Sequence, residues 1–264
     1  MEKNLLSSEE ITIISVTKND YEGIRRTVES VKEQDFSAWK LIIVLSSASD
    51  SSYDYAQQLS RDHSNIHYLI PDSLGIYLGM NFALEKFEAK LTWFLNGGDT
   101  FLNEYVLSCA YRYMVRYKPS VLIGGYTILE NGRRRVFSRH KSEISARKFS
   151  LNIRSGNHQA MLFNFSDHEK PKFDLDLELA ADFLLVLKEL RHKPALRIPE
   201  VFVEVEPGGV SSTYIEKVWI EKQSARKMVF GQYSLDSLLG IIWTCAVRLK
   251  RLTRTFFNSW NVKP

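Results

Sequence analysis

The segment Ile11-Thr12-Ile13-Ile14-Ser15-Val16-Thr17-Lys18-Asn19-Asp20 gives the clearest indication of the fold. Its first six residues form a mostly apolar, β-branched run, which predicts a buried strand, and its last four form a polar turn. From Tyr21 to Gln34 apolar residues recur at helical spacing, and Leu41–Leu45 is a second apolar run. The order strand, helix, strand predicts two parallel strands joined by a crossover helix.

The same unit continues through the first hundred residues. Strands are predicted at Ile66–Ile70 and Leu91–Leu95, with a helix around Met80–Phe87 between them. Strands that are apolar throughout predict a mostly parallel sheet that helices cover on both faces. Ligands of such sheets bind beyond the carboxyl ends of the strands. These ends are residues 17–20, 45–52, 71–77 and 96–100.

The second half of the chain is less regular. It contains three predicted strands, Val121–Ile123, Met161–Phe165 and Arg197–Glu206, and one predicted helix, Leu177–Leu190. There is no internal repeat and no low-complexity linker. We therefore expect one continuous α/β domain over residues 1–214.

A helical tail is expected over residues 215–264. Leu238–Val247 is apolar, and beyond it basic residues alternate with leucines and aromatic residues as far as Trp260. This segment is shorter than the roughly 18 apolar residues of a membrane span. Its pattern is typical of an amphipathic helix on an anionic membrane surface. The alternative is a helix that packs on the domain or on a partner subunit.

Composition excludes several classes of protein. The 264 residues are 44% hydrophobic and 25% charged, which excludes a disordered or fibrous chain. A net charge of +4 is too small to predict a nucleic-acid partner. The two cysteines, Cys109 and Cys245, form no disulfide framework, and residues 1–10 contain no signal peptide, so we expect a cytoplasmic protein.

Asp99 is the first candidate for chemistry. It follows a predicted strand in the sequence Asn96-Gly97-Gly98-Asp99. The two glycines allow a sharp turn and the close approach of a ligand. A carboxylate at this place is suited to a divalent cation, which prefers oxygen ligands. The alternative is a turn whose aspartate caps the next element.

Asp182 is the second candidate. It lies on the apolar stripe of its predicted helix, three residues after Leu179 and four before Val186. A charge on that face is costly unless it has a partner or lines a cleft. Asp182 is therefore a candidate site residue, with a salt-bridged core aspartate as the alternative. His158 and Gln159 begin a strand-like segment, and the sequence has no P-loop, no GxSxG elbow and no zinc motif.

The order of these segments resembles a family 2 glycosyltransferase of the GT-A fold, in the bacterial subgroup that builds colanic-acid, capsule and O-antigen repeats. Each motif alone is weak, and the signal is their order over residues 11–212. The matching segments are Thr17-Lys18-Asn19, LSSASD (45–50), DSLGIYLGMN (72–81), FLNGGD (94–99), His158-Gln159-Ala160, Phe173-Asp174, Ala180-Ala181-Asp182-Phe183 and Gly208-Gly209-Val210-Ser211.

The resemblance implies a Rossmann-like α/β domain with a nucleotide-sugar-binding half, about residues 11–100, and an acceptor half, residues 101–214. Asp99 would hold Mg²⁺ or Mn²⁺ on the donor diphosphate, and Asp182 would act as general base in an inverting transfer. The implied donor-binding residues are Thr17, Asn19, Asp50, Asp72, Gly75, Asn81 and Asn96. The implied acceptor or phosphate-binding residues are His158, Gln159, Arg133 and Arg135.

The resemblance also implies partners and a location. The acceptor would be an oligosaccharide, with a lipid diphosphate as its anchor, at the inner face of a bacterial cell membrane. Four positions depart from the family pattern. Leu45, Leu78 and Gly125 stand where acidic residues are usual, and Phe82 stands where a basic residue is frequent. Leu45 and Leu78 are the strongest of these departures. They favour the alternative of a degenerate, transferase-like scaffold protein. A sugar nucleotidyltransferase is a third interpretation, but Thr17-Lys18-Asn19-Asp20 lacks the Gly- and Arg/Lys-rich loop of that class.

Overall fold

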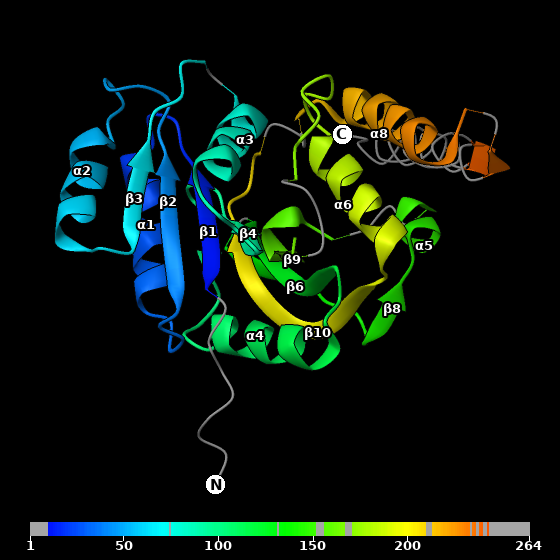
Figure 1. Cartoon of the computed structure of the whole chain (residues 1–264), viewed down its shortest axis with the longest axis horizontal. Coiled ribbons are helices and arrows are strands. Elements are labelled where there is room, and N and C mark those ends of the chain that lie inside the picture. Colours follow the sequence, from blue (N-terminus) through cyan, green and yellow to red (C-terminus); the bar gives the residue numbers. More distant parts are fainter. Residues whose placement is uncertain are drawn as a thin grey trace, which may run out of the picture.

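A ten-stranded sheet forms the centre of the fold (Figure 1). The structure is a computed structural model, and it describes residues 10–73, 75–130, 132–151, 156–166, 171–209, 213–232, 234, 235, 238, 239 and 242. The strand order is β3-β2-β1-β4-β9-β6-β10-β5, with β7 beside β6 and β8 beside β10. The predicted α/β fold, a central sheet flanked by helices, is confirmed.

The first half of the sheet is parallel. Strand β1 pairs in parallel with both β2 and β4, and β2 pairs in parallel with β3. Helices α1, α2 and α3 make the crossovers, so the carboxyl ends of these strands meet at one edge, as the sequence predicts. The bounds are β1 Ile11–Val16, α1 Tyr21–Lys32, β2 Trp39–Val44, α2 Tyr53–Asp62, β3 Ile66–Leu69, α3 Ile76–Lys86 and β4 Leu91–Phe94.

The second half is mixed, which corrects the expectation of a mostly parallel sheet. Strand β9 is antiparallel to both β4 and β6, and among the described strands of this half β10 and β6 alone pair in parallel. The basic stretch after β6 turns back as the antiparallel strand β7, which the sequence pattern did not predict. The bounds are β5 Thr100–Phe101, α4 Val106–Tyr117, β6 Val121–Glu130, β7 Arg133–Phe137, β8 Ser142–Ile144, α5 Ala146–Leu151, η1 His158–Ala160, β9 Met161–Asn164, α6 Ala181–His192 and β10 Ala195–Val205.

Helices cover the two faces of the sheet with separate hydrophobic cores. One core joins the sheet to α1, α2 and α4, and the other joins it to α3, α5, α6 and α8. In Figure 1, α4 lies below the sheet, whereas α3 and α6 lie above it. Helix α6 begins at Ala181, four residues later than predicted, and this places Asp182 in its first turn.

Helix α8 (Ile215–Phe230) packs on the domain instead of extending away from it. Ala225 and Val229 are buried in the same core as α6, and the two helices lie side by side in Figure 1. The segment for which we predicted a membrane-surface helix lies outside the described residues, except for Leu238, Leu239 and Ile242, which are exposed. No helix among the described residues is long and apolar enough to cross a membrane.

Candidate active site

Asp182 is held in place by three hydrogen bonds. The N–H at Nδ1 of His158 lies 3.0 Å from its Oδ2, and the Tyr77 hydroxyl donates to its Oδ1 at 3.1 Å. The backbone N–H of Phe183 also donates to Oδ1, at 2.8 Å. The Asp182 side chain remains a quarter exposed. This carboxylate is therefore fixed in orientation but still open on one side to a ligand.

The surroundings of Asp182 keep it ionised. Burial acts to raise the pKa of this carboxyl, but the hydrogen bond and charge of His158, the charge of Lys222 and the Phe183 amide outweigh it. The pKa of Asp182 is therefore lowered from its ordinary value. Its position in the first turn of α6 adds the favourable field of the helix N-terminus. An ionised, oriented and partly open carboxylate can accept a proton.

Helix α8 supports the start of α6 from outside. The buried side chain of Glu221 accepts hydrogen bonds from the backbone N–H groups of Leu179 (2.7 Å) and Ala180 (3.0 Å). Lys222 lies over the ring of Phe183, and Arg226 donates to the Ser150 carbonyl through Nε and Nη2. These contacts join α8 to the segment that carries Asp182.

Asp99 ends the turn after β4. Oδ1 of its carboxylate accepts the N–H of Glu206 at 2.9 Å, and its carbonyl accepts the hydroxyl of Thr27 at 2.7 Å. Thr27, on α1, also accepts the N–H of Gly98 at 3.0 Å. Gly98 has φ +96°, a backbone conformation that residues with a side chain rarely adopt, so glycine is favoured at this position.

Burial raises the pKa of Asp99 to about 6. The carboxylate is only 5% exposed, and its interactions with the Glu206 N–H, His158 and Gln159 reduce the shift without cancelling it. His158 thus interacts with both acids, since its Nδ1 bonds Asp182 while its charge acts on Asp99. The structure therefore brings together Asp99, the pair His158 and Gln159, and Asp182, which come from three separate parts of the sequence.

The residues around Asp99 fit a divalent cation that shares a phosphate ligand. Buried oxygen atoms of Thr17 (Oγ1), Asn96 (Oδ1) and Gln159 (Oε1) have no hydrogen-bond partner among the described residues. Mg²⁺ and Mn²⁺ prefer oxygen ligands, and Mg²⁺ is often bound by one or two carboxylates plus phosphates. The described residues contain no group of three or more His, Cys, Asp and Glu side chains that could hold a metal. A cation at Asp99 thus requires oxygens from a bound ligand.

Two loops meet at the ends of β1 and β2 through Asp50. Its carboxylate accepts the N–H of Asn19 (2.9 Å), the hydroxyl of Ser46 (2.7 Å) and the N–H of Ser52 (2.9 Å). Although burial acts in the opposite direction, these bonds lower the pKa of Asp50. Thr17 lies close by, where a Cβ on Gly97 would come within 2.9 Å of its Oγ1. The loops after β1, β2 and β4 therefore form one surface, with Asp50 as its internal link.

Asn81 of α3 links this helix to the segment before α6. Its side chain donates to the Phe173 carbonyl (2.9 Å) and accepts the Phe173 N–H (2.8 Å), and it is buried. These bonds give Asn81 a structural role, and its contact with a donor remains a prediction. Asp72 is exposed in the loop after β3, and Gly75 precedes α3 with φ +151°.

Arg133 and Arg135 lie on β7 and are exposed. Arg135 forms an ion pair with Glu130 at 2.7 Å and lies over the ring of Phe137. Its guanidinium therefore has a partner within the hairpin of β6 and β7. A phosphate-binding role for these two arginines remains a prediction.

Sequence reasoning missed Tyr77 and Glu221 as site residues. Tyr77 lies within a matching motif but was given no role of its own. In the structure its hydroxyl donates to Asp182 and its ring stacks on Phe173. Glu221 lies in a helix that we had assigned to the tail. The signal that could have found them is a polar side chain at a buried position of a helix. Burial of these positions is known only once the packing of the helix is known.

The chain matches the family described as Glycosyl transferase family 2 over residues 12–167, more than half of its length. It is 29% identical over 212 residues to an uncharacterized glycosyltransferase of Mycobacterium tuberculosis, a match that covers 79% of each chain. It is 25% identical over 120 residues to TuaG of Bacillus subtilis, a glycosyltransferase named for teichuronic acid biosynthesis, covering 45% of this chain and 47% of that one.

Solved structures share the fold. Residues 1–349 of S. aureus TarS, in complex with UDP-GlcNAc, superpose with a TM-score of 0.71 at 16% identity, over 97% of this chain and 76% of that one. The mannosyltransferase PcManGT from Pyrobaculum calidifontis, in complex with GDP-Man and Mn²⁺, gives a TM-score of 0.60 at 12% identity, over 97% and 81%. Together with the family match, these likenesses establish that the chain is a glycosyltransferase that belongs to glycosyl transferase family 2.

Proposed function

We propose that this protein is a metal-dependent, inverting glycosyltransferase that moves a sugar from a nucleotide-sugar to an oligosaccharide acceptor, with Asp182 as general base and Asp99 as metal ligand. The observation that carries the proposal is the linked pair of acids. Asp182 is ionised and partly open, Asp99 is buried beside oxygens that lack partners, and His158 interacts with both.

The donor is proposed to bind over the loops after β1, β2 and β4. Thr17 and Asn96 offer buried oxygens without a partner among the described residues, and Asn19 lies in the loop that Asp50 fixes. Structural neighbours in complex with UDP-GlcNAc and with GDP-Man support a nucleotide-sugar as the donor class. Asp72 and Gly75 border the same edge of the sheet.

The transfer step follows from the position of Asp182. An acceptor hydroxyl donates its proton to the carboxylate while its oxygen forms a bond to the anomeric carbon of the donor. The bond from that carbon to the diphosphate breaks, and its electron pair leaves with the nucleoside diphosphate. A bound cation would neutralise the charge of this leaving group. A single displacement inverts the anomeric carbon, and His158 and Tyr77 keep the base oriented throughout.

The acceptor and the location complete the proposal. We place the acceptor in bacterial surface polysaccharide synthesis, of the colanic-acid, capsule or O-antigen kind, with a lipid-diphosphate anchor. The tail would hold the enzyme at the inner face of the membrane. Truncation should begin after Phe230, because Glu221 and Arg226 of α8 are part of the domain. The truncated protein should leave anionic vesicles, and equal binding by both forms would refute the tail as the anchor.

The degenerate scaffold remains the second candidate, because Leu45 is fully buried in the core at the end of β2 and offers no polar group to a nucleoside. Thermal shift and calorimetry with UDP, GDP, CDP and dTDP and their sugars, each with and without Mn²⁺, separate the two candidates. Metal-dependent stabilisation by one nucleotide is the expected result. A folded protein that binds none of them would favour the scaffold.

A further inference from the structure

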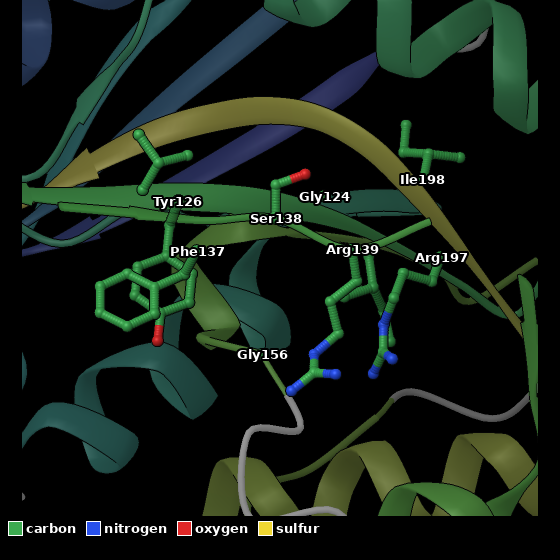
Figure 2. A pocket seen from close by; sticks show the side chains of 10 residues that line it. Gly124, Tyr126, Phe137, Ser138, Arg139, Gly156, Arg197 and Ile198 are labelled. Atoms are coloured by element: carbon green, nitrogen blue, oxygen red, sulfur yellow. The ribbon is translucent and has the colours of Figure 1, made fainter. Parts of the chain in front are cut away.

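A cavity of about 290 Å³ opens beside the candidate active site, between β6, β7 and β10 (Figure 2). Its volume is at the lower end of small-molecule pockets, which run from roughly 300 to 1,000 Å³. Figure 2 shows stacked rings at one end, Tyr126 and Phe137, and two guanidinium groups at the other, Arg139 and Arg197. No acidic residue is among those that line it in the described part of the chain.

Arg197 is the unusual member of this cavity. Its side chain is only 7% exposed, and its Nη2 atom has no hydrogen-bond partner among the described residues. Burial lowers the pKa of Arg197, and the neighbouring charge of Arg139 lowers it further. Among the described residues that line the cavity, no carboxylate is available to pair with either arginine. Two adjacent cations in a partly buried site are costly unless an anion joins them.

The Arg197 end of the cavity lies on the same face of the sheet as α6, the helix that carries Asp182. Arg197 pairs in register with Ile123 of β6, and register partners of parallel strands point to the same face. Ile123 belongs to the core that contains α6. The segment η1, which carries His158, packs against both β6 and β10. A Cβ on Gly156, which lines the cavity, would contact Ile123 at 3.2 Å. The cavity therefore lies beside the segment that orients the base.

The cavity is also separate from the proposed donor surface. That surface lies at the ends of β1, β2 and β4, and β9 stands between β4 and β6 in the sheet. A group bound at Arg197 therefore lies over β6 and β10, away from the strands that carry the proposed donor surface.

We infer that Arg197 and Arg139 form a subsite for an anionic substituent, a carboxylate or a phosphate, of the acceptor sugar. The inference rests on the proposed transferase function. A guanidinium pair recognises carboxylate and phosphate oxygens by charge-assisted hydrogen bonds. The rings of Tyr126 and Phe137 offer an apolar wall to the sugar ring. A neutral acceptor would leave the buried charge of Arg197 without compensation, so the subsite selects for acidic sugars.

The test measures the binding of glucuronate, glucose 6-phosphate and glucose to the full-length protein by calorimetry at low salt. The first ligand supplies a carboxylate, the second a phosphate and the third no charge. We expect at least one anion to bind more tightly than glucose, and the preferred anion identifies the substituent. Arg197→Gln should weaken that binding about tenfold or more. The exposed Arg139→Gln should act in the same direction and keeps the test valid where Arg197→Gln fails to fold.

Arg116→Gln is the matched control, because it removes one positive charge from the exposed face of α4. It should leave anion binding unchanged. Equal affinity for all three sugars, or unchanged anion binding in Arg139→Gln, would overturn the inference. Competition between the anion and UDP with Mn²⁺ would also overturn it, since the ligand would then occupy the donor site.

Nucleotide binding, measured on the same protein, distinguishes a failure of the subsite from a failure of the transferase proposal. A protein that binds UDP, or another nucleotide, but no anionic sugar keeps the transferase proposal and loses the subsite. Anion binding through Arg197 in a protein that binds no nucleotide supports the subsite and contradicts the transferase function on which its role as an acceptor site rests.

Discussion

Asp99 and Asp182 are two carboxylates of one site in opposite electrostatic states. Asp99 is almost fully buried, accepts few hydrogen bonds and has its pKa raised to about 6 by burial. Asp182 is a quarter exposed, accepts hydrogen bonds from His158, Tyr77 and Phe183, and has its pKa lowered. The difference is the supply of donors and positive charge, not the residue type.

This difference assigns the roles. A buried carboxylate with too few donors gains most from a cation, whereas one with a full set of donors stays ionised and can accept a proton. His158 interacts with both acids and acts to lower the pKa of each. Each of the following substitutions changes one of the two acids or the histidine that interacts with both.

The largest effect is expected for Asp182→Asn. An amide cannot accept the acceptor proton, so transfer should fall by about a thousandfold or more, while donor binding stays within about twofold. Transfer rates and calorimetry with the nucleotide-sugar measure the two quantities. Asp54→Asn, on the exposed face of α2, is the control. Full transfer activity in Asp182→Asn would show that Asp182 is not the general base.

Asp99→Asn should have a large but different effect. The neutral side chain is a poor metal ligand, so the Mn²⁺-dependent part of nucleotide affinity should fall by about a hundredfold. Titration of Mn²⁺ in the presence of nucleotide measures it. Metal dependence equal to that of the wild type would contradict the site.

The same variant tests the raised pKa through stability. Because the folded pKa of about 6 exceeds the unfolded value of 3.8, the metal-free wild type loses stability as pH rises from about 4 to 6. Asp99→Asn should therefore be more stable at pH 8, by at most about 3 kcal/mol, and no more stable below pH 4. Urea denaturation of both proteins at pH 8 and below pH 4 measures the difference in stability. An equal gain in stability at the two pH values would contradict the raised pKa of Asp99.

His158→Gln should give the smallest change in rate, about tenfold, but a distinctive one. His158 lowers the pKa of Asp182, so its removal raises that pKa and moves the acidic limb of the kcat/KM profile to higher pH. The pH profile of the variant beside the wild type is the measurement. His67→Gln, on β3, is the control. If the acidic limb of the pH profile stays in place in His158→Gln, His158 does not set the pKa of the base.

The first half of the fold follows from local pattern. Apolar runs such as Ile11–Val16 alternate with helical segments, and short crossovers leave few arrangements other than a parallel sheet. The second half was less predictable, because β9 inserts between β4 and β6 and its pairing with both is antiparallel. Pairing between strands so far apart in the chain has no local signal.

The candidate site divides in the same way. Asp99 stood out because it follows a strand and two glycines, and Asp182 because an acid interrupts an apolar stripe. Asn81 looked equivalent to them in its motif, yet its amide bonds both backbone groups of Phe173. Arg197 gave no signal at all, since an arginine within a strand is ordinary until its burial is known.

The family, the parallel half of the sheet and the two candidate acids were predictable from the chain alone, because they depend on residue types and short spacings. Packing between distant segments was needed to see that His158 interacts with both acids, that α8 supports α6, and that Arg197 and Arg139 share a cavity. Burial and partner distances set the pKa of an acid and the availability of an arginine, and both arise only when distant segments pack.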